Sequence, residues 1–297
     1  MGDVPQSLRA SGTSGGGFAP YEALRDFVHH GFCKRQNPSQ SPRPLQAILK
    51  RPRVNRLILL LTLFLTTNCF GQDKFVIKEI IGQNKLSEYN VQDIKINPNN
   101  IFEDSLYVVS KTCSGEWGGT IKFKNKKTGV EYSAASTCPI VVNKFNGKYY
   151  ITNTLAHLSG FSEILEISNP DSMSIFKLPK PRAKKGKTIV RYVGDNETKS
   201  TKGTRQLVDS IGVLTLSSFP YDGQLYYIVT DFKKTYLTKI ENHKFVTIDT
   251  ISNKSIWTYD PEVFIKDNGH RITVFKNQEV KGVLDIYKNQ ITIIRKK

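Results

Sequence analysis

The sequence has few cysteines and histidines, and this scarcity bears on metal and cofactor chemistry. Its 297 residues include four cysteines and five histidines; after residue 71 only two cysteines and three histidines are left, and these do not form a closely spaced group. A structural zinc site takes about four Cys or His ligands, usually in closely spaced pairs. We therefore expect no metal site, and no motif in the chain implies a cofactor.

A long hydrophobic run is also missing. The longest apolar stretch, Leu57–Leu65, ends at Thr66 and is much shorter than the roughly 20 residues that a membrane-spanning helix needs. Four basic residues precede it, and small residues follow it as far as Gly71. This order is typical of a signal peptide. We expect residues 50–71 to be the signal peptide, with cleavage near Gly71 and release to the periplasm or outside the cell, leaving no transmembrane helix.

A lipoprotein leader with Cys69 as the lipidated residue is the alternative. The bacterial lipobox has a small residue directly before the cysteine, and Asn68 departs from that pattern. We therefore place the cleaved, secreted form first and the lipoprotein form second.

Residues 1–49 have little apolar sequence to bury. They include a Gly/Ser-rich stretch at 12–17 and a Pro/Ser/Gln-rich stretch at 37–44, and such composition does not offset the chain entropy lost on folding. Because a signal peptide belongs at an N-terminus, we expect the biological start near Leu49 or Lys50. Residues 1–49 are then a disordered or mis-annotated extension, and a long genuine leader is the alternative.

A sustained 3.6-residue apolar period is absent after residue 72, which excludes a helical domain. Alternating strands and Gly-containing turns occur instead. We expect 72–297 to be a single all-β domain of repeated antiparallel hairpins. The expected hairpins span Thr120–Ser133, Ile140–Thr154, Phe161–Phe176, Val213–Val229, Thr235–Ile251 and the segment from His270 to Ile294.

Three segments repeat a pattern of turn, glycine and strand. They are Phe145–Ser168, Tyr221–Asn242 and, more weakly, Asn268–Asn289. One propeller blade takes about 40–45 residues, so a β-propeller of about five blades is our first expectation, with a basic loop insertion near 177–209. A β-sandwich or an open stack of meanders is the alternative. Neither a WD nor a kelch signature is present.

Basic residues outnumber acidic residues in the chain. After residue 71 the chain keeps 34 basic and 23 acidic residues, a net charge of +11. Such a surface favours anionic partners, although lysines also keep β-sheet edges soluble.

Six cations and no acid occur in 177–187, among them Arg182, Lys184, Lys185 and Lys187. Pro and Gly prevent this segment from forming a helix, and we therefore predict a flexible loop. The loop either is simply solvated or binds an anionic envelope component. Aromatic residues for base stacking are absent, and we expect no nucleic acid.

A nucleophile elbow such as G-x-S-x-G is missing as well. His157 lies in a loop near Ser159 and Ser162, which permits a Ser–His pair, but a hydrogen-bonded loop histidine explains the sequence as well. A glycosidase needs two nearby carboxylates. The candidates lie beside Gly, Pro or aromatic residues, where turns also use acids; they are Glu116, Asp222, Asp231, Asp260 and Glu262.

Two features remain as candidate sites. Cys113 and Cys138 bracket an expected hairpin and form a natural disulfide in an oxidising compartment, with two buried thiols as the alternative. Between them, Glu116 and Trp117 lie in a Gly-rich loop and resemble a sugar-stacking pair, unless Trp117 anchors the turn in the core. His157 joins Glu116 and Trp117 as a candidate binding residue.

The sequence as a whole favours an exported bacterial β-repeat protein that binds a glycan, an envelope component or another protein without catalysis. We expect no catalytic residues. The alternative is a carbohydrate-active hydrolase on a propeller-like scaffold.

Overall fold

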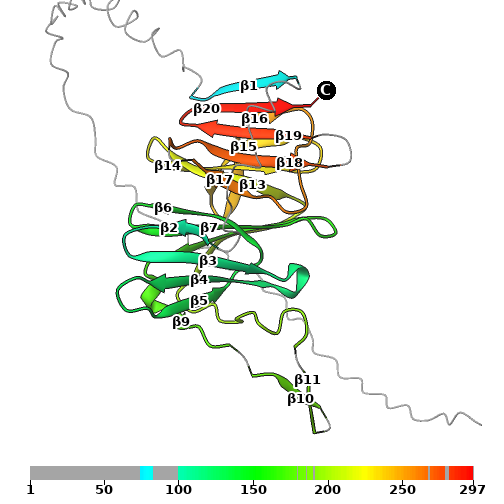
Figure 1. The fold of residues 1–297 in the computed structure, drawn as a ribbon. Coiled ribbons are helices and arrows are strands. Elements are labelled where there is room, and N and C mark those ends of the chain that lie inside the picture. The colour runs from blue at the N-terminus through cyan, green and yellow to red at the C-terminus, as the bar shows by residue number, and fades with distance from the viewer. Residues whose placement is uncertain are drawn as a thin grey trace, which may run out of the picture. The chain divides into compact units, whose positions relative to one another are not determined.

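The computed structural model describes residues 74–82, 100–178, 180–184, 186–189, 191–266, 268–277 and 281–296. The expected signal peptide and the segment before it lie outside these residues. The described residues all belong to one compact unit that spans Cys69–Lys297. They form four mostly antiparallel sheets of four or five strands and one short two-stranded hairpin, which confirms the expected all-β class (Figure 1).

Sheets 1 and 2 come first along the chain. Sheet 1 has the order β2-β3-β4-β5-β9 and sheet 2 the order β12-β8-β7-β6. The strands of sheet 1 are β2 (Asn100–Glu103), β3 (Tyr107–Cys113), β4 (Gly119–Asn125), β5 (Glu131–Ala135) and β9 (Ser174–Ile175). Those of sheet 2 are β6 (Pro139–Phe145), β7 (Lys148–Leu155), β8 (Phe161–Ile167) and β12 (Arg205–Ile211).

Sheets 3 and 4 follow. Sheet 3 has the order β13-β14-β15-β16, and sheet 4 the order β1-β20-β19-β18-β17. The strands of sheet 3 are β13 (Leu214–Tyr221), β14 (Gln224–Thr230), β15 (Thr235–Glu241) and β16 (Lys244–Ser252). Those of sheet 4 are β17 (Val263–Ile265), β18 (Arg271–Lys276), β19 (Lys281–Tyr287), β20 (Gln290–Arg295) and β1 (Val76–Ile81), which runs parallel to β20.

Turn chemistry sets the hairpins within these sheets. The two-residue turns Asn146-Gly147 and Asp222-Gly223 place both residues at positive φ, 49° and 75° in the first and 46° and 71° in the second. This is the geometry of a type I′ turn, whose twist matches that of the flanking strands. The predicted hairpins β4–β5, β6–β7, β13–β14, β15–β16 and β18–β19–β20 are confirmed.

The predicted hairpin over Phe161–Phe176 is wrong. Its first half is β8, which pairs with β7 and β12, whereas its second half is β9, which pairs with β5 of sheet 1. The turn at Asn169–Asp171 is a 3₁₀ turn that carries the chain out of sheet 2. The chain re-enters sheet 2 only at β12, so the predicted insertion separates the third and fourth strands of this sheet.

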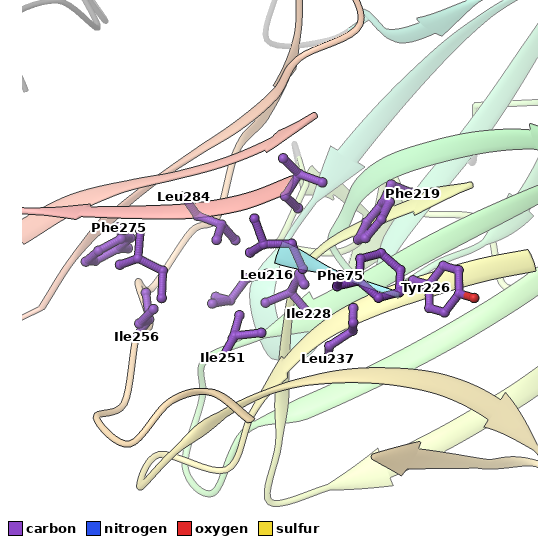
Figure 2. Close-up of a cluster of buried hydrophobic side chains, with 13 residues drawn as sticks. Phe75, Leu216, Phe219, Tyr226, Ile228, Leu237, Ile251, Ile256, Phe275 and Leu284 are labelled. Atoms are coloured by element: carbon purple, nitrogen blue, oxygen red, sulfur yellow. The ribbon is translucent and has the colours of Figure 1, made fainter. Parts of the chain in front are cut away.

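Hydrophobic clusters lie between successive sheets. One cluster joins sheets 1 and 2 around Phe123, Tyr149 and Ile151, and another joins sheets 2 and 3 around Ile164 and Tyr227. Figure 2 shows the cluster between sheets 3 and 4. Sheets 2 and 3 are thus covered on both faces, which explains why β14 carries an uninterrupted apolar run, Leu225–Val229, rather than an alternating pattern. No closed ring of blades is seen among the described residues.

Candidate functional site

Four loops meet at one end of the sheets. Because strands alternate in direction, the β3–β4, β7–β8 and β14–β15 connections and the β16–β17 link leave their sheets on the same side. Contacts confirm this placement: Phe232 lies against Gly160, where an added Cβ would be 2.7 Å from the ring, and its ring is 5.7 Å from that of Trp257. We call residues 114–118, 156–160, 231–234 and 253–262 the loop face.

Two predicted binding residues meet on the loop face. Glu116 lies in a 3₁₀ turn, Gly115–Trp117, and His157 lies in the β7–β8 loop. His157 Nδ1 is 3.5 Å from Glu116 Oε2, and both side chains are about half exposed, at 48% and 50%. The structure therefore brings together a carboxylate and an imidazole that are 41 positions apart in the sequence.

Trp117 does not anchor the turn in the core. The residue is 57% exposed. It is contacted from the side by the chain between β11 and β12: Gly194 approaches so closely that an added Cβ would lie 2.8 Å from Trp117 Cβ, and Lys199 Nζ donates to Trp117 O at 3.3 Å. The indole is thus held in place while much of it faces solvent.

A buried carboxylate, Glu197, fixes this neighbouring segment. Glu197 is 5% exposed. It accepts hydrogen bonds from Ser114 Oγ at 2.7 Å, from Thr120 Oγ1 at 2.5 Å and from Thr112 Oγ1. Hydrogen bonds to a charged acceptor are about twice as strong as neutral ones, so this cluster ties the insertion to sheet 1. Sequence analysis did not identify Glu197, because nothing around it marks a buried acid.

Two cavities flank this segment. The first, of about 340 Å³, is lined by Trp117, Val193, Gly194, Glu197 and Lys199 among others. The second, of about 370 Å³, also reaches Lys199, and its lining includes five small hydroxyl residues, namely Ser136, Thr137, Thr198, Thr201 and Thr204. Such a lining offers many hydrogen-bond donors and acceptors to a polar ligand.

Glu163 supplies the carboxylate of the second cavity. Burial raises the pKa of its carboxyl, although Gln206 Nε2 and Asn153 Nδ2 oppose this by donating to it, at 2.6 and 2.7 Å. Asn153 in turn accepts from Ser136 Oγ at 2.7 Å. The cavity therefore contains a connected polar network that ends in a carboxyl with a raised affinity for a proton.

The predicted Ser–His pair is not formed by Ser162. This side chain is buried, and its hydroxyl bonds Thr215 Oγ1 at 2.5 Å, on sheet 3. Ser159 is exposed in the same loop as His157.

The remaining carboxylates are spread over the molecule. Asp222 lies in the β13–β14 turn, at the opposite end of the sheets from the loop face, and pairs with Lys74 at 3.0 Å. Asp231 accepts from the backbone N–H groups of Lys233 and Lys234 and so holds its own turn. Glu116 and Asp222 therefore do not form a catalytic pair.

Asp260 and Glu262 lie near a cation of sheet 1. Burial lowers the pKa of Lys111 on β3, while the charges of Asp260 and Glu262 raise it. The link into sheet 4 therefore carries its acids within electrostatic range of sheet 1.

The basic segment forms a hairpin rather than an irregular loop. β10 (Arg182–Lys184) pairs with β11 (Lys187–Ile189), with Lys184 opposite Lys187. Gly186, at φ 76°, supplies the left-handed turn conformation that the hairpin needs. Lys187 is exposed, and Lys185 lies outside the described residues.

The predicted disulfide is confirmed. Cys113 at the end of β3 is bonded to Cys138 before β6, with a Cα–Cα distance of 4.4 Å. Gly119 explains how these segments come so close, because an added Cβ there would lie 2.5 Å from Ser136 O. The bond braces the base of the loop that carries Glu116 and Trp117.

The described ranges contain no group of three or more His, Cys, Asp or Glu residues placed to hold a metal ion. Within the same ranges, no helix has the length and apolar character required to cross a membrane. Comparisons of the chain with protein-family models, with curated proteins and with solved structures gave no match.

Proposed function

We propose that the chain is an exported binding module in which the part of the loop face around Glu116, Trp117 and His157, together with the adjoining cavities, binds a hydroxyl-rich ligand, most simply a glycan of the cell envelope. The observation that carries this proposal is the exposed indole of Trp117, held in place beside Glu116 and next to two cavities. An aromatic face stacks on the apolar side of a sugar ring, while carboxylates and hydroxyls bond its hydroxyl groups.

A glycan array followed by calorimetry tests this proposal. For a glycan that the chain binds, Trp117→Ala should weaken binding tenfold or more, because truncating an aromatic anchor of a site costs roughly 2 kcal/mol. Tyr259→Ala is the matched control: Tyr259 is 65% exposed on the loop face but lines neither cavity. Equal loss in both variants, or none in Trp117→Ala, would contradict the site.

A property of Glu163 specifically favours the hydrolase alternative. A carboxyl whose pKa is raised by burial suits a general acid, and Glu163 has this property. Release of reducing ends from the bound glycan, abolished by Glu163→Gln, would favour the hydrolase. Binding without release favours the non-catalytic module.

Export is part of the same proposal. We place the leader at residues 50–71 and the mature start near Gln72, and the Cys113–Cys138 disulfide supports an oxidising compartment. N-terminal sequencing of the protein recovered from the periplasm or the medium tests this. A start at Gln72 is expected, whereas a lipid-modified Cys69 would favour the lipoprotein alternative.

The basic hairpin offers a second contact for an anionic envelope component. Lys187 is exposed and lies opposite Lys184 in the hairpin register. Binding through such a segment should weaken steeply with added salt, whereas sugar stacking on Trp117 should not. A protein partner is the alternative for the same surface.

The scaffold that we infer is propeller-like. Three features support it: four successive meanders each pack on the next, β1 completes the last sheet beside β20, and Asp260 and Glu262 come within electrostatic range of Lys111. The count of about five blades stays a prediction, which an experimental density map of the whole chain would test.

A further inference from the structure

A third cavity lies at the opposite end of the sheets from the loop face. It encloses about 290 Å³ where the β13–β14, β17–β18 and β19–β20 turns emerge. Its lining combines aromatic rings with cations and an amide and includes Phe219, Tyr221, Asn268, Arg271, Tyr287 and Lys288. Among the described residues, no acidic side chain lines this cavity.

Arg271 occupies a position of β18 that faces the core. Along this strand, Thr273 and Phe275 point toward sheet 3: Thr273 Oγ1 bonds Leu216 O of β13, and Phe275 belongs to the cluster between sheets 3 and 4. Ile272 and Val274 lie in the cluster on the other face. Since side chains alternate along a strand, Arg271 points the same way as Thr273 and Phe275.

Arg271 has no acidic partner among the described residues. Its Nη1 is buried and makes no hydrogen bond. Two acids of the neighbouring elements are engaged elsewhere: Asp285 of β19 pairs with His270 at 2.8 Å, and Asp222 of the β13–β14 turn pairs with Lys74 at 3.0 Å. Burial lowers the pKa of Arg271 to about 10, and no charged neighbour opposes this effect. A partly buried cation without a counter-charge is costly.

The neighbouring groups complete a donor set. Asn268 Oδ1 accepts from the backbone N–H of His270 at 3.3 Å, which leaves the Asn268 amide nitrogen as a donor. The Tyr287 ring is fixed by stacking on His270, with 4.4 Å between ring centroids, and Lys288 Nζ lies 5.2 Å from the same ring. Two cations and an amide thus surround a cavity with aromatic walls.

We propose that this cavity binds an oxyanion, a carboxylate or phosphoryl group carried by a small organic ligand, with the Arg271 guanidinium as its main partner. The planar fork of arginine matches two oxygens of such a group. Tyr221 and Phe219 would contact the apolar body of the ligand. This site is separate from the loop face and does not depend on the proposed function.

Calorimetric titration of the full chain with inorganic phosphate, sulfate or acetate, at constant ionic strength set by chloride, tests the proposal. The wild type should bind at least one of these oxyanions saturably, and which one binds distinguishes a phosphoryl from a carboxylate ligand. Arg271→Met should abolish binding, and Arg271→Lys, which keeps the charge but loses the fork, should weaken it at least tenfold. Arg205→Gln is the control, since Arg205 is exposed and already paired with Glu166 at 2.9 Å.

Thermal unfolding gives a second readout. Phosphate, sulfate or acetate should raise the melting temperature of the wild type and of Arg205→Gln but not that of Arg271→Met, because a ligand stabilises only the state that binds it. Without these anions, Arg271→Met should melt at the same temperature as the wild type or higher. If Arg271→Met fails to fold, Arg271→Lys carries the test.

Three results would overturn the proposal. The first is the absence of saturable binding by the wild type, and the second is unchanged binding in Arg271→Met and Arg271→Lys. The third concerns Asp267, which precedes the site in the sequence and lies outside the described residues. Binding by Asp267→Asn alone, and not by the wild type, would show that this carboxylate already fills the site.

Discussion

At the residue scale, the Asp104 carboxylate joins sheets 1 and 2. It accepts from the backbone N–H groups of Leu106 and Tyr107, both at 2.8 Å, and from Lys144 Nζ at 2.6 Å and Tyr149 OH at 2.7 Å. Burial alone would raise the pKa of this carboxyl, but the hydrogen bonds from Lys144, Tyr149 and the backbone outweigh burial and hold the pKa well below its usual range.

Asp104→Asn should therefore lower the free energy of unfolding by about 2 kcal/mol at pH 7. Because the folded-state pKa lies below the unfolded value of about 3.9, the contribution of Asp104 is complete well above that value and is lost as pH falls below it. Urea denaturation at pH 7, 5 and 3 measures this, and the gap between wild type and variant should shrink at pH 3. The exposed Asp249→Asn is the control, and a gap independent of pH would contradict the argument.

Single side chains were the hardest to predict from the sequence. Glu116, Trp117 and His157 stood out because they lie in loops beside glycines, and the structure places Glu116 and His157 together. Glu197 and Arg271 were missed, because a buried charge looks like any surface charge until the facing element is known. For Arg271 a signal existed: it alternates in register with Thr273 and Phe275 along the strand.

At the element scale, local turn chemistry was sufficient for most hairpins. Asn146-Gly147 and Asp222-Gly223 specify both the turn and the pairing of their flanking strands. The prediction from turn chemistry was wrong at Asn169–Asp171. The turn residues there are equally clear, but the following strand β9 pairs with β5. A turn signal says that the chain changes direction; it does not say which sheet supplies the next partner.

The disulfide is the element-scale feature with the clearest consequence. It closes a separation of 25 residues between the end of β3 and the β5–β6 link. The double variant Cys113→Ser/Cys138→Ser should lose about 3 kcal/mol of unfolding free energy, chiefly because the unfolded chain gains freedom. Urea denaturation with and without reductant measures the loss. Reductant should destabilise the wild type but not the double variant, and a wild type insensitive to reductant would contradict the prediction.

At the scale of the whole molecule, sheet 4 unites segments from opposite ends of the described chain. β1 runs parallel to β20, with Val76 N donating to Asn289 O at 2.9 Å and Gly82 N to Arg295 O at 3.0 Å. Sequence patterns could not predict this pairing, because no turn or period connects two strands separated by about 200 residues. Pairing of this kind depends on the complete fold, since closing such a long loop costs entropy before any contact forms.

Phe75, directly before β1, holds this strand to the core. It is 5% exposed, and its ring centroid lies 4.8 Å from that of Tyr226 and 6.1 Å from that of Phe219 (Figure 2). Phe75→Ala should lower the unfolding free energy by about 3–5 kcal/mol, because it removes a buried ring and leaves a cavity. Phe176→Ala is the comparison variant: Phe176 is only partly buried, belongs to none of the four hydrophobic clusters, and has Lys122 Nζ 3.6 Å from its ring centroid, so its loss should cost about 1 kcal/mol.

Hydrogen exchange shows where the stability lost in Phe75→Ala resides. If β1 is a late, separable addition to sheet 4, amides of β1 and β20 should exchange much faster in the variant while those of β7 in sheet 2 keep most of their protection. If the four sheets unfold as one unit, all core amides should lose protection equally. We expect the first result, because β1 contacts sheet 3 through Phe75 and sheet 4 through β20, whereas the cluster between sheets 1 and 2 contains no residue of β1. A uniform loss of amide protection would instead mean that the β1–β20 pairing determines the stability of all four sheets.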